Sequence, residues 1–237
     1  MTLPINAVVL GATGYVGGEL LRLIAGHPRM KLAAAVSTSC EGQPVATTFP
    51  HLASACDGVS FCGHDDWPGK LEHGAKVALF SAAPHGASAR TIANALDAAA
   101  GMDVEIHVVD SSADFRYTKQ TDFEDVYLVE HGAPALLDQF QCSVPELASK
   151  IDTPHVGHPG CFATAISLAA VPLLQAGIAK PELFVAATTG STGSGRSPQA
   201  GTHHPERHSN QYAYKPLAHR HTPEITSMCN AVSDSPC

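Results

Sequence analysis

The sequence is poor in charge and contains no long apolar run. Only 15% of its 237 residues are Asp, Glu, Lys or Arg, against about 25% in an average soluble chain. No run approaches the roughly 20 apolar residues of a membrane span, and residues 1–6 lack the basic and apolar regions of a signal peptide. We therefore expect a soluble, cytoplasmic protein, with part of its surface covered by a partner subunit.

Excess positive charge and clustered cysteines are also lacking. The formal net charge is -8 at pH 7, which argues against an electrostatic surface for nucleic acid or anionic lipid. The 7 cysteines are scattered and form no Cys-x-x-Cys pair, so neither a disulfide framework nor a zinc knuckle is expected. Most of the thiols are predicted to be small buried groups in a reducing compartment.

The sequence instead contains short apolar runs that alternate with helical patterns. Four of these runs are typical of strands covered on both faces of a sheet: 7–10, 32–36, 77–80 and 106–109. Helical spacing follows the first run over residues 16–24, and an Ala-rich helix is predicted between residues 86 and 100. Strands alternating with helices indicate an α/β fold with a doubly wound, parallel Rossmann-type sheet.

The pattern changes in the later part of the chain. Residues 162–176 carry a helical apolar stripe that Pro172 interrupts, and residues 184–187 are a strand candidate. The polar stretch 198–223 has no clear strand or helix of its own. A loop of that length in a compact domain is typical of a functional or disordered segment.

A glycine turn links the first predicted strand to the first predicted helix. Gly11, Gly14 and Gly17 allow a sharp turn and let backbone N–H groups approach a pyrophosphate at the helix N-terminus. The second predicted strand ends in the hydroxyl residues 37–39, where an NAD site usually has a carboxylate, and the nearest acid is Glu41. The turn therefore predicts dinucleotide binding, and the hydroxyls favour NADP.

Cys161 is the candidate nucleophile. It follows a Pro-Gly turn and precedes an apolar helix, whose N-terminus would stabilise the thiolate. A nucleophilic thiol needs a proton acceptor or donor nearby in space, and His219 and His221 are the candidates. Arg116 and Arg196 are candidates for fork-like recognition of a carboxylate or phosphate.

Seven motifs follow one another along the chain: GATGYVGGEL (11–20), SAAPHG (81–86), DSSADFR (110–116), VPEL (144–147), HPGCFAT (158–164), GSTGSGR (190–196) and HRHTPEI (219–225). In this order they resemble the N-acetyl-gamma-glutamyl-phosphate reductase family of arginine biosynthesis. The similarity covers roughly residues 5–225. The aminoadipyl-phosphate reductases of lysine biosynthesis are closely similar, so both pathways stay open.

The resemblance implies NADPH-dependent reduction of an acyl phosphate to a semialdehyde. Cys161 would attack N-acetylglutamyl 5-phosphate, releasing phosphate and forming a thioester, which hydride from NADPH would convert to N-acetylglutamate 5-semialdehyde. His219, with His221 as the alternative, would be the general acid–base. The implied cofactor-binding residues are Gly11, Thr13, Gly14, Tyr15, Val16, Gly17, Ser37, Thr38, Ser39, Ser81 and Pro84. The implied substrate-binding residues are Arg116, Ser194 and Arg196.

The end of the resemblance sets the expected domains. Residues 1–155 are predicted to be an NADP-binding Rossmann domain, and residues 156–225 the first part of an α+β catalytic and oligomerisation domain. Residues 226–237 resemble nothing in the family, whose members continue further, so we expect a frameshift or premature stop. A complete domain would form a homo-oligomer, a dimer or a tetramer.

Two other hypotheses belong to different classes of protein. One is a truncated, catalytically impaired remnant whose Rossmann half binds NADP while the second half cannot act. The other is a histidine-rich metal-binding module that uses His203, His204 and His208. Because nothing in the sequence fixes a third or fourth ligand, no metal is expected.

Overall fold

The computed structural model describes residues 4–148 and 150–233. The chain divides into two compact units. Unit 1 comprises residues 1–143 and 150–158, and unit 2 comprises residues 144–149 and 159–237. No helix in the described ranges is long and apolar enough to cross a membrane.

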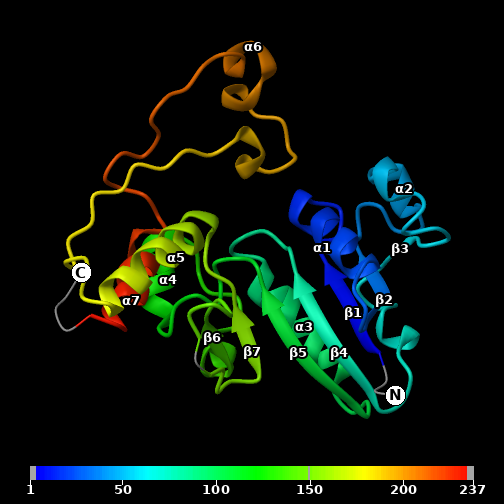
Figure 1. The fold of residues 1–237 in the computed structure, drawn as a ribbon. Coiled ribbons are helices and arrows are strands. Elements are labelled where there is room, and N and C mark those ends of the chain that lie inside the picture. The colour runs from blue at the N-terminus through cyan, green and yellow to red at the C-terminus, as the bar shows by residue number, and fades with distance from the viewer. Residues whose placement is uncertain (1–3, 149, 234–237) are drawn as a thin grey trace. The chain divides into compact units, whose positions relative to one another are not determined.

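Within the described residues, unit 1 is built on one sheet of seven strands in the order β3-β2-β1-β4-β5-β7-β6 (Figure 1). The strands are β1 (Ile5–Leu10), β2 (Met30–Val36), β3 (Phe61–Cys62), β4 (Ala75–Ser81), β5 (Val104–Asp110), β6 (Phe140–Cys142) and β7 (His155–Gly157). All six neighbouring pairs are parallel. The predicted parallel Rossmann-type sheet is confirmed, and the four predicted runs lie in β1, β2, β4 and β5.

Helices cover both faces of this sheet. They are α1 (Tyr15–Ala25), α2 (Val45–Thr48), α3 (Ser88–Ala99) and α4 (Gln120–Tyr127), with the 3₁₀ turns η1 (Pro50–Leu52), η2 (Pro68–Lys70) and η3 (Pro134–Gln139). Ala7 and Val9 of β1 share one buried cluster with Leu21 of α1, whereas Val8 shares another with Ile92 of α3. Because successive side chains of a strand point to opposite faces, α1 and α3 lie on opposite faces of the sheet. The sheet is therefore doubly wound.

The regular elements of unit 2 in the described residues are α-helices and 3₁₀ turns, joined by long irregular stretches. Its elements are α5 (Cys161–Gln175), η4 (Ser191–Ser194), η5 (Ala200–Thr202), α6 (His204–Arg207) and α7 (Thr222–Asn230). Helix α5 confirms the predicted helix over residues 162–176. A small buried cluster joins α5 to α7 through Val171, Leu174 and Cys229.

Two predictions for unit 2 are wrong. Residues 184–187 form no strand, and Phe184 is 94% exposed. A strand needs a neighbour for its backbone groups, and the described residues supply none here. The stretch 198–223 was predicted to have no element of its own, yet it contains η5, α6 and the start of α7. Pro205 and Pro223 lie in the first turns of α6 and α7, where proline is tolerated because the N–H it lacks has no partner within the helix.

The segment predicted to be a tail unlike the family begins inside α7. Residues 226–230 continue the helix, and Cys229 is fully buried. Residues 234–237 of this segment lie outside the described residues. The frameshift or premature stop stays a prediction.

Candidate active site

The turn between β1 and α1 is packed so closely that it requires glycine. Gly11 has a φ of +67°, and a Cβ on it would lie 2.8 Å from the backbone of Ala82, in the loop after β4. A Cβ on Gly17 would lie 2.7 Å from the backbone of Ala12. These glycines therefore let α1 begin directly against β1 and the loop after β4.

The N-terminus of α1 is open to an anionic group. Gly14, at the N-cap, provides no side-chain cap, and the first turn holds no acidic residue. The N–H groups of the first turn and the helix dipole favour a phosphate at this place. Tyr15 and Val16 are 45% and 51% exposed, which leaves apolar surface available on the same turn. The turn thus fits the pyrophosphate of a dinucleotide.

Hydroxyl groups meet where β2 ends. The Oγ1 atom of Thr13 lies 3.5 Å from Ser37 Oγ, which lies 3.2 Å from Ser39 Oγ. The carboxylate of Glu41 lies instead at the end of β3, where its Oε2 would be 3.1 Å from a Cβ on Gly63. The end of β2 therefore presents hydroxyls, which leave room for a phosphate on the adenosine ribose.

A buried polar network joins the loops after β4 and β5; we call Ser81, Ser88, Asp110 and Ser112 the Asp110 network. Ser88 Oγ donates to Asp110 Oδ1 at 2.7 Å, and Ser112 Oγ donates to Oδ2 at 2.6 Å. Ser81 Oγ lies 2.7 Å from Ser88 Oγ. Burial outweighs these hydrogen bonds and raises the pKa of Asp110 to about 6. Ser81, predicted to bind the cofactor, is thus a fully buried member of this network.

A second carboxylate fixes the loop that carries Pro84. Asp114 is fully buried and accepts the N–H groups of Gly86 at 2.8 Å and Ala89 at 2.9 Å. Pro84 is exposed, as is Thr38 after β2. These two predicted cofactor-binding residues are therefore accessible, whereas Ser81 is not.

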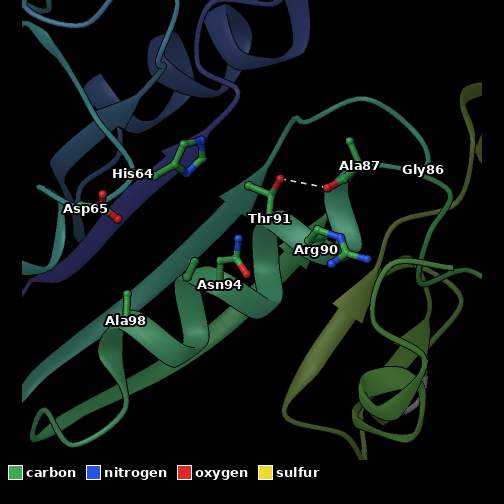
Figure 2. Close-up of a pocket in the computed structure, with 9 residues that line it drawn as sticks. His64, Asp65, Gly86, Ala87, Arg90, Thr91, Asn94 and Ala98 are labelled. Carbon is green, nitrogen blue, oxygen red and sulfur yellow. Dashed lines mark hydrogen bonds between the residues drawn. The ribbon is translucent and has the colours of Figure 1, made fainter.

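An open groove of about 460 Å³ lies between α3 and the loop after β3 (Figure 2). His64 and Asp65 come from the loop, and Arg90, Thr91 and Asn94 come from α3. None of the predicted site residues lines this groove. The sequence gives no signal for it, because its walls come from two segments that only the fold brings together.

Arg116 holds backbone groups of unit 1. Its Nε donates to the carbonyl oxygen of His158 at 2.8 Å, and its Nη2 donates to that of Ser111 at 3.0 Å. The residue is 8% exposed. Ser194 and Arg196, the other predicted anion-binding residues, are exposed at the end of η4 and just beyond it.

Cys161 is the first residue of α5, and it is exposed. The residue before it, Gly160, is the N-cap and packs against α7. A Cβ on Gly160 would collide with the ring of His221, and the Gly160 N–H donates to Glu224 Oε2 at 2.8 Å. Glu224 lies in the HRHTPEI motif, but no role was predicted for it from the sequence.

His219 lies against the residue that follows the cysteine. Its ring centroid is 5.2 Å from that of Phe162 and 4.7 Å from that of His221. Its Nδ1 accepts the His221 N–H at 3.1 Å, so the neutral ring carries its proton on Nε2. That Nε2 lies 3.1 Å from the hydroxyl oxygen of Tyr214. The structure therefore brings both predicted histidines to the start of α5.

The surroundings of His219 favour a neutral imidazole. Burial, followed by the positive charges of Arg220 and Lys215, lowers the pKa of His219. Burial, followed by the negative charge of the Cys161 thiolate, raises the pKa of Tyr214 above 10.0. In this tautomer the Nε2–H can be donated, whereas Nδ1 already accepts the His221 N–H. Tyr214 was not predicted, since it lies in a polar stretch without a motif of its own.

The histidine-rich stretch forms no metal centre in the part of the chain that the structure describes. No three His, Cys, Asp or Glu side chains come together there to hold an ion. The rings of His204 and His208 lie 5.3 Å apart, on and just after α6.

Comparison with known proteins shows the family of this chain. Residues 6–153 match the family model described as semialdehyde dehydrogenase, NAD binding domain, and residues 161–237 match the semialdehyde dehydrogenase, dimerisation domain. The chain therefore belongs to the semialdehyde dehydrogenase family, and its first domain is the one that binds a nicotinamide cofactor in that family.

Individual relatives carry a more specific name. The chain is 38% identical to the N-acetyl-gamma-glutamyl-phosphate reductase of Symbiobacterium thermophilum, an alignment that covers 99% of this chain and 65% of the relative. It is 36% identical to that of Methanopyrus kandleri, over 95% of this chain and 64% of the relative. The chain thus spans about two thirds of the length of these relatives, and their name agrees with the resemblance that the motifs predict.

One solved structure is also similar. Aspartate semialdehyde dehydrogenase with NADP from Candida albicans aligns with a TM-score of 0.48 and 15% identity, over 74% of this chain and 48% of that chain.

Proposed function

We propose that this protein is an NADP-dependent oxidoreductase that reduces N-acetylglutamyl 5-phosphate to N-acetylglutamate 5-semialdehyde and phosphate. The observation that carries this proposal is the position of Cys161, exposed at the N-terminus of α5 with the His219–His221 pair beside it. The glycine turn of unit 1 and the names of the relatives support the cofactor and the substrate class.

In the proposed reaction, the Cys161 thiolate attacks the acyl carbon. A carbon–sulfur bond forms, the carbon–oxygen bond to the phosphoryl group breaks, and phosphate leaves with that electron pair. When bound, NADPH would supply the hydride that reduces the thioester to the aldehyde. As the carbon–sulfur bond breaks, the thiolate is regenerated. His219 holds and moves a proton at Nε2, and His221 fixes its orientation through the bond to Nδ1.

Different residues of unit 1 would hold different parts of the cofactor. The N–H groups of Gly14, Tyr15, Val16 and Gly17 would face the pyrophosphate, with Gly11 shaping the turn. Thr13, Ser37, Thr38 and Ser39 would meet the adenosine ribose and its 2′-phosphate. Pro84 would contact the cofactor from the loop after β4, and Ser81 would support that loop from within the Asp110 network.

The proposal also covers the residues that bind the anionic groups of the substrate and the assembly of the chain. Ser194 and Arg196 are exposed and would bind the substrate carboxylate or phosphate, with the cationic Arg116 at His158 as the third anion-binding residue. The match of residues 161–237 to a dimerisation domain supports a homo-oligomer, a dimer or a tetramer. Free thiols, as at Cys161, fit a cytoplasmic enzyme because that compartment is reducing.

The decisive experiment is phosphate-dependent reduction of NADP by the chain with N-acetylglutamate 5-semialdehyde as substrate. We expect Cys161→Ala to lower the rate by about 10³-fold or more, because the nucleophile is lost. Cys142→Ala, at a half-buried thiol in β6, is the matched control and should stay near wild type. An active Cys161→Ala protein would refute the mechanism.

Two further outcomes separate the alternatives. If the wild-type chain is as inactive as Cys161→Ala but still binds NADPH, the chain is an NADP-binding remnant. Equal turnover with NADH would refute the cofactor preference, and faster turnover with aminoadipate semialdehyde would assign the related lysine-pathway reaction.

A further inference from the structure

The first turn of α7 encloses the residue before Cys161 from two sides. Glu224 is 3% exposed, and its Oε2 accepts the Gly160 N–H at 2.8 Å. The ring of His221, at the N-cap of α7, occupies the place that a Cβ on Gly160 would need. Helix α7 therefore determines the backbone geometry at the point where Cys161 begins α5.

A buried carboxylate is a costly way to fill this place. A carboxylate must give up its bound water when it is buried. An apolar side chain of similar volume would pack there at lower cost. A carboxylate at position 224 thus indicates a role beyond packing, and its hydrogen bond to Gly160 shows where that role acts.

We propose that Glu224 is a positioning residue for Cys161: its carboxylate holds the Gly160 N–H and so fixes the turn from which the thiol reaches the acyl carbon. This inference rests on the proposed function, which defines what the thiol must reach. The same carboxylate acts on His219, whose pKa it raises against the larger lowering by burial and by cations. The charged and titratable groups around His219 are Tyr214, Lys215, Arg220, His221 and Glu224.

Two substitutions separate the hydrogen bond from the charge. Glu224→Asp keeps the charge but is one methylene too short to reach Gly160, whereas Glu224→Gln keeps the length and an acceptor oxygen. We expect Glu224→Asp to lower kcat about 10- to 100-fold with little change in KM, the loss associated with one charge-assisted hydrogen bond. Glu224→Gln should restore kcat to near wild type. Its activity should persist to lower pH, because His219 loses a negative neighbour that favours the imidazolium.

A second readout does not need turnover. Iodoacetamide alkylates the full chain, and mass spectrometry after digestion then gives the rate at the peptide that contains Cys161, so this thiol is followed separately from the other six cysteines. We expect alkylation about two- to fivefold slower in Glu224→Asp, because the turn that presents the Cys161 thiol is no longer held by the hydrogen bond to Gly160. Glu224→Gln and the control Glu182→Asp, at an exposed site, should match wild type.

The outcomes decide between the inference and the proposed function. A folded Glu224→Asp protein with wild-type alkylation and kcat would overturn the inference. If neither wild type nor the variants turn over substrate, but alkylation is still slower in Glu224→Asp than in Glu224→Gln, the proposed function fails and the inference stands. If the Asp variant does not fold, hydrogen exchange at the Gly160 amide of Glu224→Gln decides: retained protection supports the inference, and lost protection with unchanged alkylation refutes it.

Discussion

Asp110, at the end of β5, is fully buried, and burial raises the pKa of its carboxyl from 3.8 to about 6. The folded chain therefore binds this proton more tightly than the unfolded chain, so the free energy of unfolding falls as the pH rises from 3.8 to about 6. This difference in pKa between the folded and the unfolded chain corresponds to about 3 kcal/mol of unfolding free energy. Because asparagine does not ionise, we expect the free energy of unfolding of Asp110→Asn to fall less than that of wild type between pH 3.8 and about pH 6.

Urea unfolding at about pH 4 and about pH 7 measures this effect as a difference between two proteins. Asp138→Asn, at an exposed site in η3, is the control and should follow wild type within about 0.5 kcal/mol at both values. The prediction for Asp110 is wrong if Asp110→Asn and wild type show the same change in unfolding free energy between the two pH values.

At the scale of the element, the start of α1 depends on the absence of a side chain. A methyl group at position 17 would overlap the backbone of Ala12, which is held between β1 and α1. We expect Gly17→Ala to destabilise unit 1 by about 1–3 kcal/mol and to weaken NADPH binding, because α1 must shift away from β1. Urea unfolding and titration of NADPH fluorescence provide the two measurements.

The control for this element is at the other end of α1. Gly26 is the C-cap, and a Cβ on it would lie 4.0 Å from the carbonyl oxygens of Arg22 and Leu23. Gly26→Ala should therefore stay within about 0.5 kcal/mol of wild type and bind NADPH normally. Equal effects at positions 17 and 26 would mean that close packing is not the reason for Gly17.

At the scale of the whole molecule, the two units bury very different amounts of apolar surface. Unit 1 has two large buried clusters, whereas the buried cluster of unit 2 comprises Ala170, Val171, Leu174 and Cys229 among the described residues. Since apolar burial drives folding, we expect unit 2 to unfold at lower urea than unit 1. The single tryptophan, Trp67, reports unit 1, and the fully buried Cys229 reports unit 2.

The measurement compares tryptophan fluorescence with thiol labelling across one urea series. Cys229 should become reactive before the fluorescence of Trp67 changes, whereas Cys56, buried in unit 1, should become reactive together with it. Coincident transitions for all three probes would show that the chain unfolds as one cooperative body.

The strands and the glycine turn were predictable because their signals are local. A wholly apolar run such as Val8-Val9-Leu10 is buried on both faces wherever a parallel sheet forms. Gly11 and Gly17 after it lie so close to neighbouring backbone that no side chain fits there. Residues 184–187 carry a similar apolar signal, yet strand formation depends on a pairing partner that lies elsewhere. Tyr214 carried no signal, and Glu224, although part of the HRHTPEI motif, had no predicted role, because their neighbours come from other segments of unit 2.

By itself the sequence determined the strands β1, β2, β4 and β5, the glycine turn and the cysteine at the start of a helix, because periodicity and glycine spacing act over a few residues. Only the tertiary structure decided that Arg116 binds backbone carbonyls, that Ser81 lies inside the Asp110 network, and that α7 encloses Gly160. These contacts join residues from different elements. They form because a buried polar group must find a partner, and the fold alone determines which partner is within reach.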